Sequence, residues 1–297
     1  MLTFNAAPRI DIDPNDIRDA YDRLPFGFSH DLHRLDVFAL DSLRALAQAA
    51  SDRDHFVASS APKPDTDFYA VEHSRYTPSA ALADLERGRH RILIKKPEEF
   101  DARFRRLLDA TYAQIAELRP DLRDAKLVRL ESTVLISSAK AVTPFHFDPE
   151  TTFFFHIEGE KFYHLYPPDC VAEPELERFY KKNIVNIGQL DLGARDPARE
   201  FMFPLTAGKG HHQPHNAPHW VETGEGRSVS YVVSFVTETM HALAMTRAFN
   251  HYLRKTGRTP ERPGTHARSD ALKSQAMMFA LPLRRRVRET IRTAFGR

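Results

Sequence analysis

The stretch Thr151–Tyr166, TTFFFHIEGEKFYHLY, decides the class of fold. Its first seven residues are aromatic or β-branched apart from one histidine, which is typical of a β-strand. A turn containing Gly159 follows, and a second strand-like run begins at Lys161 and ends before Pro167. The stretch therefore predicts a β-hairpin with glycine in its turn.

Segments on both sides of this hairpin also predict strands. Residues 126–138, KLVRLESTVLISS, partly alternate and are rich in β-branched side chains, and residues 227–236, RSVSYVVSFV, follow a glycine-containing turn. Several short strands separated by turns favour an antiparallel barrel or sandwich over a doubly wound α/β fold. The sequence contains no glycine-rich phosphate-binding loop, which argues against a nucleotide-binding fold.

The residues before this region predict mainly helix. The clearest helix covers 97–118, where apolar side chains recur at steps of three and four after a proline and two acids. Shorter helices are expected near 41–47 and 78–85. Short β-rich runs at 56–57 and 91–94 interrupt them.

The end of the chain predicts two helices. The second lies near 269–288 and contains Pro282, which predicts a kink or a break. The predicted secondary structure divides the chain into a helical N-terminal elaboration (1–125), a β-rich core (126–239) and C-terminal helices (240–297).

The composition narrows the class of protein further. Lys and Arg number 42 and Asp and Glu number 40, so a net charge of +2 does not suit a general polyanion binder. The single cysteine, Cys170, can form neither an intramolecular disulfide nor a cysteine-rich zinc site. No apolar run reaches the roughly 20 residues of a membrane span, and no secretory signal is visible, so a soluble cytoplasmic protein is expected.

His146 and Asp148 form a candidate metal-binding pair. In an extended segment, side chains two residues apart point to the same face, so an imidazole and a carboxylate can grip one ion. The pair alone decides little, because 15 His and 40 acids in 297 residues produce about two such triplets by chance and the sequence has two. Pro144 and Pro149, however, flank the pair and disfavour a helix there.

A second histidine cluster lies about seventy residues later in GKGHHQPHNAPHWV, residues 208–221. Its glycines and prolines predict a loop that leads into a strand, with His211 and His212 exposed or in the loop. His219 is the preferred third ligand, and His215 is its rival. Two histidines and one carboxylate with open coordination positions are the ligand set of non-haem Fe(II) oxygenases.

Several motifs together resemble one known family. These are VTPFHFD (142–148), TTFFFHIEGEKFYHLYPPD (151–169), APHWVET (217–223) and SVSYVVSF (228–235). They resemble the cupin-like, JmjC-related Fe(II)/2-oxoglutarate oxygenases, nearest the factor-inhibiting-HIF (asparaginyl hydroxylase) branch. The resemblance, which extends from about Leu127 to Phe235, implies a mainly β protein: a double-stranded β-helix (cupin or jelly-roll) core flanked by N- and C-terminal helices.

The resemblance also implies roles for individual residues. It makes His146, Asp148 and His219 the catalytic iron ligands. Fe(II) would be the cofactor and 2-oxoglutarate the co-substrate, and O₂ would be consumed in a hydroxylation that releases succinate and CO₂.

Three further residues would hold the co-substrate. Lys161 matches the lysine that pairs with the distal carboxylate of 2-oxoglutarate, and Thr143 matches a hydroxyl that hydrogen-bonds to the same carboxylate. Thr152 stands where the asparaginyl hydroxylase carries an amide, so it is a weaker candidate. Arg227 is a rival anchor, because other 2-oxoglutarate oxygenases use an arginine after the distal histidine; its spacing of eight residues from His219 is short for that role.

The sequence does not distinguish a protein side chain or peptide substrate from a small molecule. It also does not distinguish hydroxylation from demethylation or desaturation at the same iron. The alternative hypothesis is a non-catalytic metal-binding cupin that acts as a sensor or an interaction module. The basic run 284–288 lacks aromatic residues, so a solvated helix face or a dimer contact is expected there rather than nucleic-acid binding. Related hydroxylases dimerise through C-terminal helices, which makes residues 277–283 a candidate homodimer interface.

Overall fold

The computed structural model describes residues 8–50, 56–59, 63–67, 76–85, 90–181 and 187–295. The contacts between Cα atoms divide the chain into two compact units. The first, which we call the barrel unit, comprises residues 1–125, 129–170 and 187–235. The second, the helical unit, comprises residues 126–128, 171–186 and 236–297.

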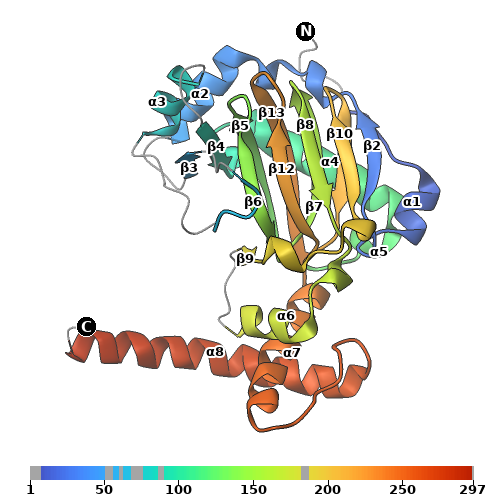
Figure 1. Cartoon of the computed structure of the whole chain (residues 1–297), viewed down its shortest axis with the longest axis vertical. Helices are drawn as coiled ribbons and strands as arrows, with labels where there is room; N and C mark the ends of the chain where they lie inside the picture. The colour runs from blue at the N-terminus through green and yellow to red at the C-terminus, as the bar shows by residue number, and fades with distance from the viewer. Residues whose placement is uncertain are drawn as a thin grey trace. The chain divides into compact units, whose positions relative to one another are not determined.

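The barrel unit is mainly β and is built from two antiparallel sheets (Figure 1). In the order of pairing, the eight-stranded sheet consists of β1 (Ile10–Asp11), β2 (Phe26–His30), β11 (Lys209–Gln213), β7 (Thr151–Glu158), β13 (Ser228–Thr237), β5 (Leu127–Ser137), β4 (His90–Lys95) and β3 (Phe56–Ser59). The five-stranded sheet consists of β10 (Phe201–Leu205), β8 (Lys161–Leu165), β12 (Pro218–Thr223), β6 (Val142–Phe147) and β9 (Gly188–Gln189). Two such antiparallel sheets make a jelly-roll, as the sequence predicted.

The two strands predicted within residues 151–166 are present as β7 and β8, but the prediction that they form a β-hairpin is wrong. Strand β7 belongs to the eight-stranded sheet and β8 to the five-stranded sheet, so the turn between them carries the chain from one sheet to the other. This turn requires Gly159, whose φ is +80°. A Cβ atom at that position would lie 2.1 Å from the carbonyl oxygen of Arg227, so no other residue fits without a shift of the backbone.

The interior of the barrel unit lies between the two sheets. Phe154 on β7 and Val232 on β13 face inward from the large sheet and pack against Tyr163, Leu165 and Val221 of the small sheet. Because side chains alternate along a strand, every second residue from these positions also faces the interior.

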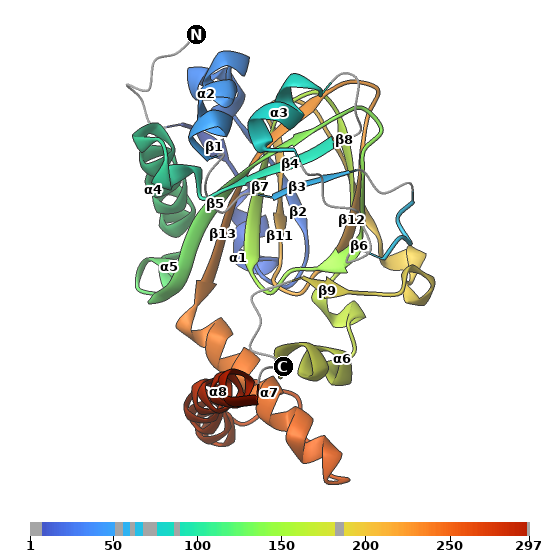
Figure 2. The ribbon, with the colours of Figure 1, turned by 90° about the vertical axis from the view of Figure 1, so that its left-hand side faces the viewer.

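Helices of the N-terminal region cover the barrel unit. They are α1 (Pro14–Asp19), α2 (Leu40–Ala50), α3 (Pro78–Ala83), α4 (Ala102–Leu118) and α5 (Pro120–Arg123). Helix α4 lies along the outer face of the large sheet (Figure 2), where Phe104 contacts Tyr231 and Tyr112 contacts Phe235, with ring centroids 6.0 and 5.3 Å apart. Short 3-10 helices complete the unit: Leu32–Arg34, Asp36–Phe38, Pro97–Glu99, Pro168–Cys170, Leu192–Ala194 and Pro197–Arg199.

The helical unit contains α6 (Glu173–Tyr180), α7 (Glu238–Lys255) and α8 (Ala267–Phe295). Arg247 and Arg254 on α7 form ion pairs with Glu173 and Glu177 on α6. Helix α8 continues through Pro282, so the break that this proline predicted is absent.

Two expectations from the sequence concern the predicted segments of the chain and the absence of a membrane span. The division of the chain at residues 125 and 239 stays a prediction. Within the described residues, no helix combines the length and the apolar character that a membrane crossing needs.

Candidate metal centre

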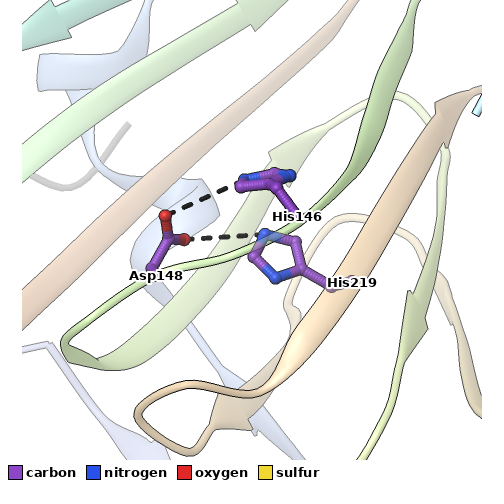
Figure 3. A group of neighbouring side chains, drawn as sticks. All are labelled: His146, Asp148 and His219. Atoms are coloured by element: carbon purple, nitrogen blue, oxygen red, sulfur yellow. Dashed lines mark ion pairs between the residues drawn. The ribbon is translucent and has the colours of Figure 1, made fainter. Parts of the chain in front are cut away.

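Three side chains converge on the interior side of the small sheet (Figure 3). His146 on β6 and His219 on β12 stand directly opposite each other, and Asp148 follows the end of β6. The Nε2 atoms of His146 and His219 lie 3.8 and 3.6 Å from carboxylate oxygens of Asp148. One ligand atom from each residue lies within 4.8 Å of the other two, which makes these the residues that could hold a metal ion among those described.

Both imidazoles are oriented by backbone carbonyl groups. The Nδ1 atom of His146 lies 2.7 Å from the carbonyl oxygen of Pro144, and that of His219 lies 3.1 Å from the carbonyl oxygen of Ala217. A carbonyl oxygen only accepts hydrogen bonds, so each Nδ1 carries the proton and each Nε2 turns its lone pair toward the centre. This is the usual arrangement of metal-binding histidines.

The two histidines are also held in the neutral form that binds metals. Burial, together with the smaller effect of the neighbouring His219, lowers the pKa of His146 to about 3. Burial likewise lowers the pKa of His219, although Asp148 opposes the shift. Both imidazoles are therefore uncharged at neutral pH and need not lose a proton to bind an ion.

The geometry fits one divalent metal ion. Imidazole nitrogen and carboxylate oxygen bind such ions at about 2.0–2.2 Å, so two ligand atoms of one ion can be at most about 4.4 Å apart. The measured separations of 3.6 and 3.8 Å satisfy this limit. Three ligands leave open positions on an octahedral ion, and the N₂O set suits Fe(II).

A β-bulge brings Thr143 to the same interior face as His146. Thr143 pairs with Val221, and His146 pairs with His219, so β6 has one residue more than β12 between the two pairs. Val221 packs in the interior cluster, so its partner Thr143 also faces inward. A regular strand would send side chains three residues apart to opposite faces.

Lys161 lies inside the barrel unit and is only 4% exposed. Its Nζ atom donates a 3.4 Å hydrogen bond to Ser230 and stands 5.6 Å from the centroid of the Phe154 ring. No described residue forms an ion pair with it. Burial, together with the smaller effect of the positive charge of Arg91, lowers its pKa from 10.5 to about 7. The interior thus holds a positive charge that an anionic ligand would stabilise.

Thr152 is buried and faces the interior two residues before Phe154. Its hydroxyl lies 3.2 Å from the hydroxyl of Ser234 on β13. The two hydroxyls therefore satisfy each other in the absence of a ligand.

The structure places both rival residues away from the triad. The Nδ1 atom of His215 lies 2.6 Å from the carboxylate of Asp22, which also accepts a hydrogen bond from the backbone N–H of His215. Arg227 forms an ion pair with Glu158 and is about one-third exposed. Neither side chain joins the triad.

The expectation for His211 and His212 was wrong, since both are fully buried. Residues 209–213 form strand β11, which pairs with β2 on one side and β7 on the other. His211 faces the interior and stacks on Phe154, whereas His212 faces the other side and accepts a hydrogen bond from the N–H of Asp22.

Three buried residues near the centre were not predicted from the sequence as functional candidates: Arg91, Tyr163 and Gln213. Arg91 on β4 shares a face with Leu93, whose partner Leu135 packs against the interior cluster, so Arg91 also faces inward. Burial lowers the pKa of Arg91 to about 10. The sequence HRILIK, residues 90–95, could have indicated this role of Arg91: apolar residues on both faces predict a buried strand, and an arginine within such a strand predicts a buried positive charge.

Comparison with known proteins finds similar structures but no similar sequences. No protein-family model and no curated protein matches the chain. The X-ray structure of Escherichia coli ycfD is 14% identical, with a TM-score of 0.52 over 93% of this chain and 69% of that one. Two further structures are also 14% identical to this chain, and each has a TM-score of 0.49. One is described as YcfD, a ribosomal oxygenase from Escherichia coli, and the match covers 93% of this chain and 68% of that one. The other is YcfD in complex with cobalt and 2-oxoglutarate, and the match covers 92% of this chain and 68% of that one. At this identity the likeness to ycfD shows a common fold.

Proposed function

We propose that this protein is an Fe(II)- and 2-oxoglutarate-dependent oxygenase that hydroxylates an unactivated C–H bond and releases succinate and CO₂. The observation that carries the proposal is the convergence of His146, Asp148 and His219 on the interior of a jelly-roll. Both imidazole Nε2 atoms and one carboxylate face a common point, in the ligand set that non-haem Fe(II) oxygenases use.

Fe(II) held by these three residues would supply the activation of O₂ and the oxidative decarboxylation of the co-substrate. The chain's own part is to hold the ligands and to keep water out. His146 and His219 are at most 5% exposed, and the side chain of Asp148 is 23% exposed. The centre is therefore reached mainly from the side of Asp148.

Lys161 is the proposed anchor for the distal carboxylate of 2-oxoglutarate. It is a buried cation on the same interior surface as the triad, and a bound carboxylate would offset the cost of burying its charge. Thr143, brought to this surface by the bulge, offers a hydroxyl to the same carboxylate. Arg91 adds a second buried positive charge, which favours a dianionic ligand over a monoanion.

The finer assignments follow from these residues and stay proposals. The lysine at position 161 and the threonine at position 143 support a place nearest the asparaginyl hydroxylase branch. Thr152 is a weaker contact for the co-substrate, because its short hydroxyl already bonds to Ser234. The substrate is a protein side chain or a small molecule, and a cytoplasmic location stays a prediction.

The direct test measures succinate formed from 2-oxoglutarate with and without added Fe(II). We expect turnover that requires Fe(II) and that is lost in His146→Ala. His266→Ala is the matched control, because His266 is an exposed histidine of the helical unit. Turnover that survives His146→Ala would contradict the ligand assignment. Binding of metal and 2-oxoglutarate without succinate release would instead identify a sensor or interaction module.

A second measurement tests the anchor. Lys161→Ala should raise the 2-oxoglutarate concentration needed for half-maximal turnover by tenfold or more, at unchanged Fe(II) affinity. Lys209→Ala, which removes an exposed lysine of β11, serves as the control. An unchanged requirement would exclude Lys161 as the anchor.

We also propose that the chain forms a homodimer through its C-terminal helices. Leu272 and Phe279 on α8 are 70% and 81% exposed, and a spacing of seven residues places them on one helix face. Within residues 277–281 of the candidate stretch, Met277 and Leu281 are buried in the helical unit, whereas Met278 and Phe279 are 38% and 81% exposed. Phe279 is the more exposed of these two and is the main candidate for an intermolecular contact.

A further inference from the structure

A chain of two hydrogen bonds connects Tyr163 to the carboxylate of Asp148. The hydroxyl of Tyr163 donates to Oε1 of Gln213 over 2.8 Å, and Nε2 of Gln213 donates to Oδ2 of Asp148 over 3.3 Å. Tyr163 and Gln213 are both buried. The chain crosses the barrel interior, because Tyr163 lies on β8 of the small sheet and Gln213 on β11 of the large sheet.

The same residues also touch the histidine side of the triad. The ring of Tyr163 stacks on the ring of His219, with centroids 5.3 Å apart and planes 20° apart. Gln213 ends β11, and the connection that follows it leads to His219 on β12. Within this connection, the backbone N–H of Asn216 donates a 2.8 Å hydrogen bond to the carbonyl oxygen of Asp148. Asp148 is therefore tied to the β11–β12 segment by both its backbone and its side chain.

Asp148 and Tyr163 together favour one orientation of the Gln213 amide: the carboxylate accepts from the NH₂ group, and the tyrosine hydroxyl donates to the oxygen. A side-chain amide has one accepting oxygen and one donating NH₂ group, and its two orientations are close in shape. If the tyrosine hydroxyl donates to the oxygen, the NH₂ group is directed to the carboxylate. The opposite orientation would set the amide oxygen against the negatively charged oxygen of Asp148, which is repulsive.

We propose that Gln213 and Tyr163 are positioning residues of the metal centre: the amide fixes the rotation of the Asp148 carboxylate, and the tyrosine fixes the amide. This inference rests on the proposed function. A carboxylate that is already oriented loses less conformational freedom when a metal binds. Partners that orient metal ligands in this way are worth about 10- to 100-fold in metal affinity.

The experiment measures Co(II) binding by the full-length chain, without 2-oxoglutarate, by calorimetry and by the visible absorption bands of bound cobalt. Gln213→Met keeps the length of the side chain and removes the amide, and we expect its dissociation constant for Co(II) to rise about 10- to 100-fold. Gln114→Met is the matched control. Gln114 is a partly buried glutamine on α4 whose amide bonds to the backbone of Ile10 and Pro8, so its replacement should leave Co(II) affinity unchanged.

Tyr163→Phe keeps the ring against His219 and removes only the hydroxyl. It should weaken Co(II) binding less than Gln213→Met does, because the amide remains and loses only its preferred orientation. In the double variant the loss should equal that of Gln213→Met alone, since the hydroxyl acts through the amide. Tyr112→Phe is the control, because the Tyr112 hydroxyl bonds to a backbone carbonyl outside the centre.

The outcomes separate this inference from the proposed function. Gln213→Met with wild-type Co(II) affinity, or Tyr163 and Gln213 losses that simply add, would overturn the positioning role while leaving the metal centre intact. A wild-type chain that binds no Co(II) would overturn the proposed function and this inference with it. The melting temperature of each metal-free variant distinguishes weaker binding from a loss of folded protein. Weaker Co(II) binding with an unchanged melting temperature supports the positioning role. Weaker Co(II) binding that scales with the fraction of unfolded protein overturns it.

Discussion

The buried charge of Lys161 should lower the stability of the ligand-free protein. Burial lowers the pKa of Lys161 from 10.5 to about 7, so between these pH values the unfolded chain binds a proton that the folded chain does not. The destabilisation is therefore complete below about pH 7 and is relieved as the pH rises toward 10.5. Lys161→Met removes the titrating ammonium and keeps most of the side-chain volume.

The size of the effect follows from the shift. Each pH unit in this window is worth about 1.4 kcal/mol, so the stability of the wild type relative to Lys161→Met should rise by about 2 to 3 kcal/mol between roughly pH 6 and pH 9. Urea unfolding of the metal-free proteins at the two pH values measures this difference. Lys209→Met, at an exposed lysine, should show no such dependence. An identical difference in unfolding free energy at both pH values would contradict a lowered pKa for Lys161 in the folded protein.

Three further predictions test other parts of the structure. Gly159→Ala should lower the free energy of unfolding by about 2 to 4 kcal/mol in chemical denaturation, because its Cβ would meet the carbonyl oxygen of Arg227 at a φ of +80°; a wild-type midpoint would contradict the turn geometry. Asp22→Ala leaves His215 without its carboxylate partner and should cost about 2 to 4 kcal/mol in the same assay, and an unchanged free energy of unfolding would show that the two hydrogen bonds of Asp22 to His215 contribute nothing. Phe279→Glu places a charge on the exposed face of α8 and should convert a dimer to a monomer in sedimentation experiments, whereas a variant that stays dimeric would exclude this face.

Local sequence signals were sufficient for much of the fold and for the triad. The strands β7 and β8 and the turn between them were predictable, because aromatic and β-branched residues and a turn glycine all lie within sixteen residues. That the two strands pair with different partners in different sheets was not predictable from this stretch, since it depends on the other strands. His146 and Asp148 were predictable as a pair because an extended segment sets their side chains on one face, and the structure brings His219 to them. Their role as metal ligands stays a prediction.

Other features depend on contacts that no local pattern contains. Strand β11 is rich in histidine and glycine rather than β-branched residues, and it is a strand because β2 and β7 pair with it on both sides. Strand β2 was missed as well. The approach of Gln213 to Tyr163 joins residues fifty positions apart on different sheets, so only the assembled barrel unit reveals it.

The bulge in β6 makes the length of the motif as important as its composition. Pro144 and Phe145 stand between Thr143 and His146, opposite the single residue Trp220. Inserting one residue beside Trp220 would pair the two strands residue for residue, and Thr143 and His146, three positions apart, would then face opposite sides of the small sheet. A natural or engineered chain that kept every chemical group of this segment but lost the two-against-one pairing would keep either the threonine or the histidine inside the barrel, but not both, so the spacing in the facing strand protects the site as well.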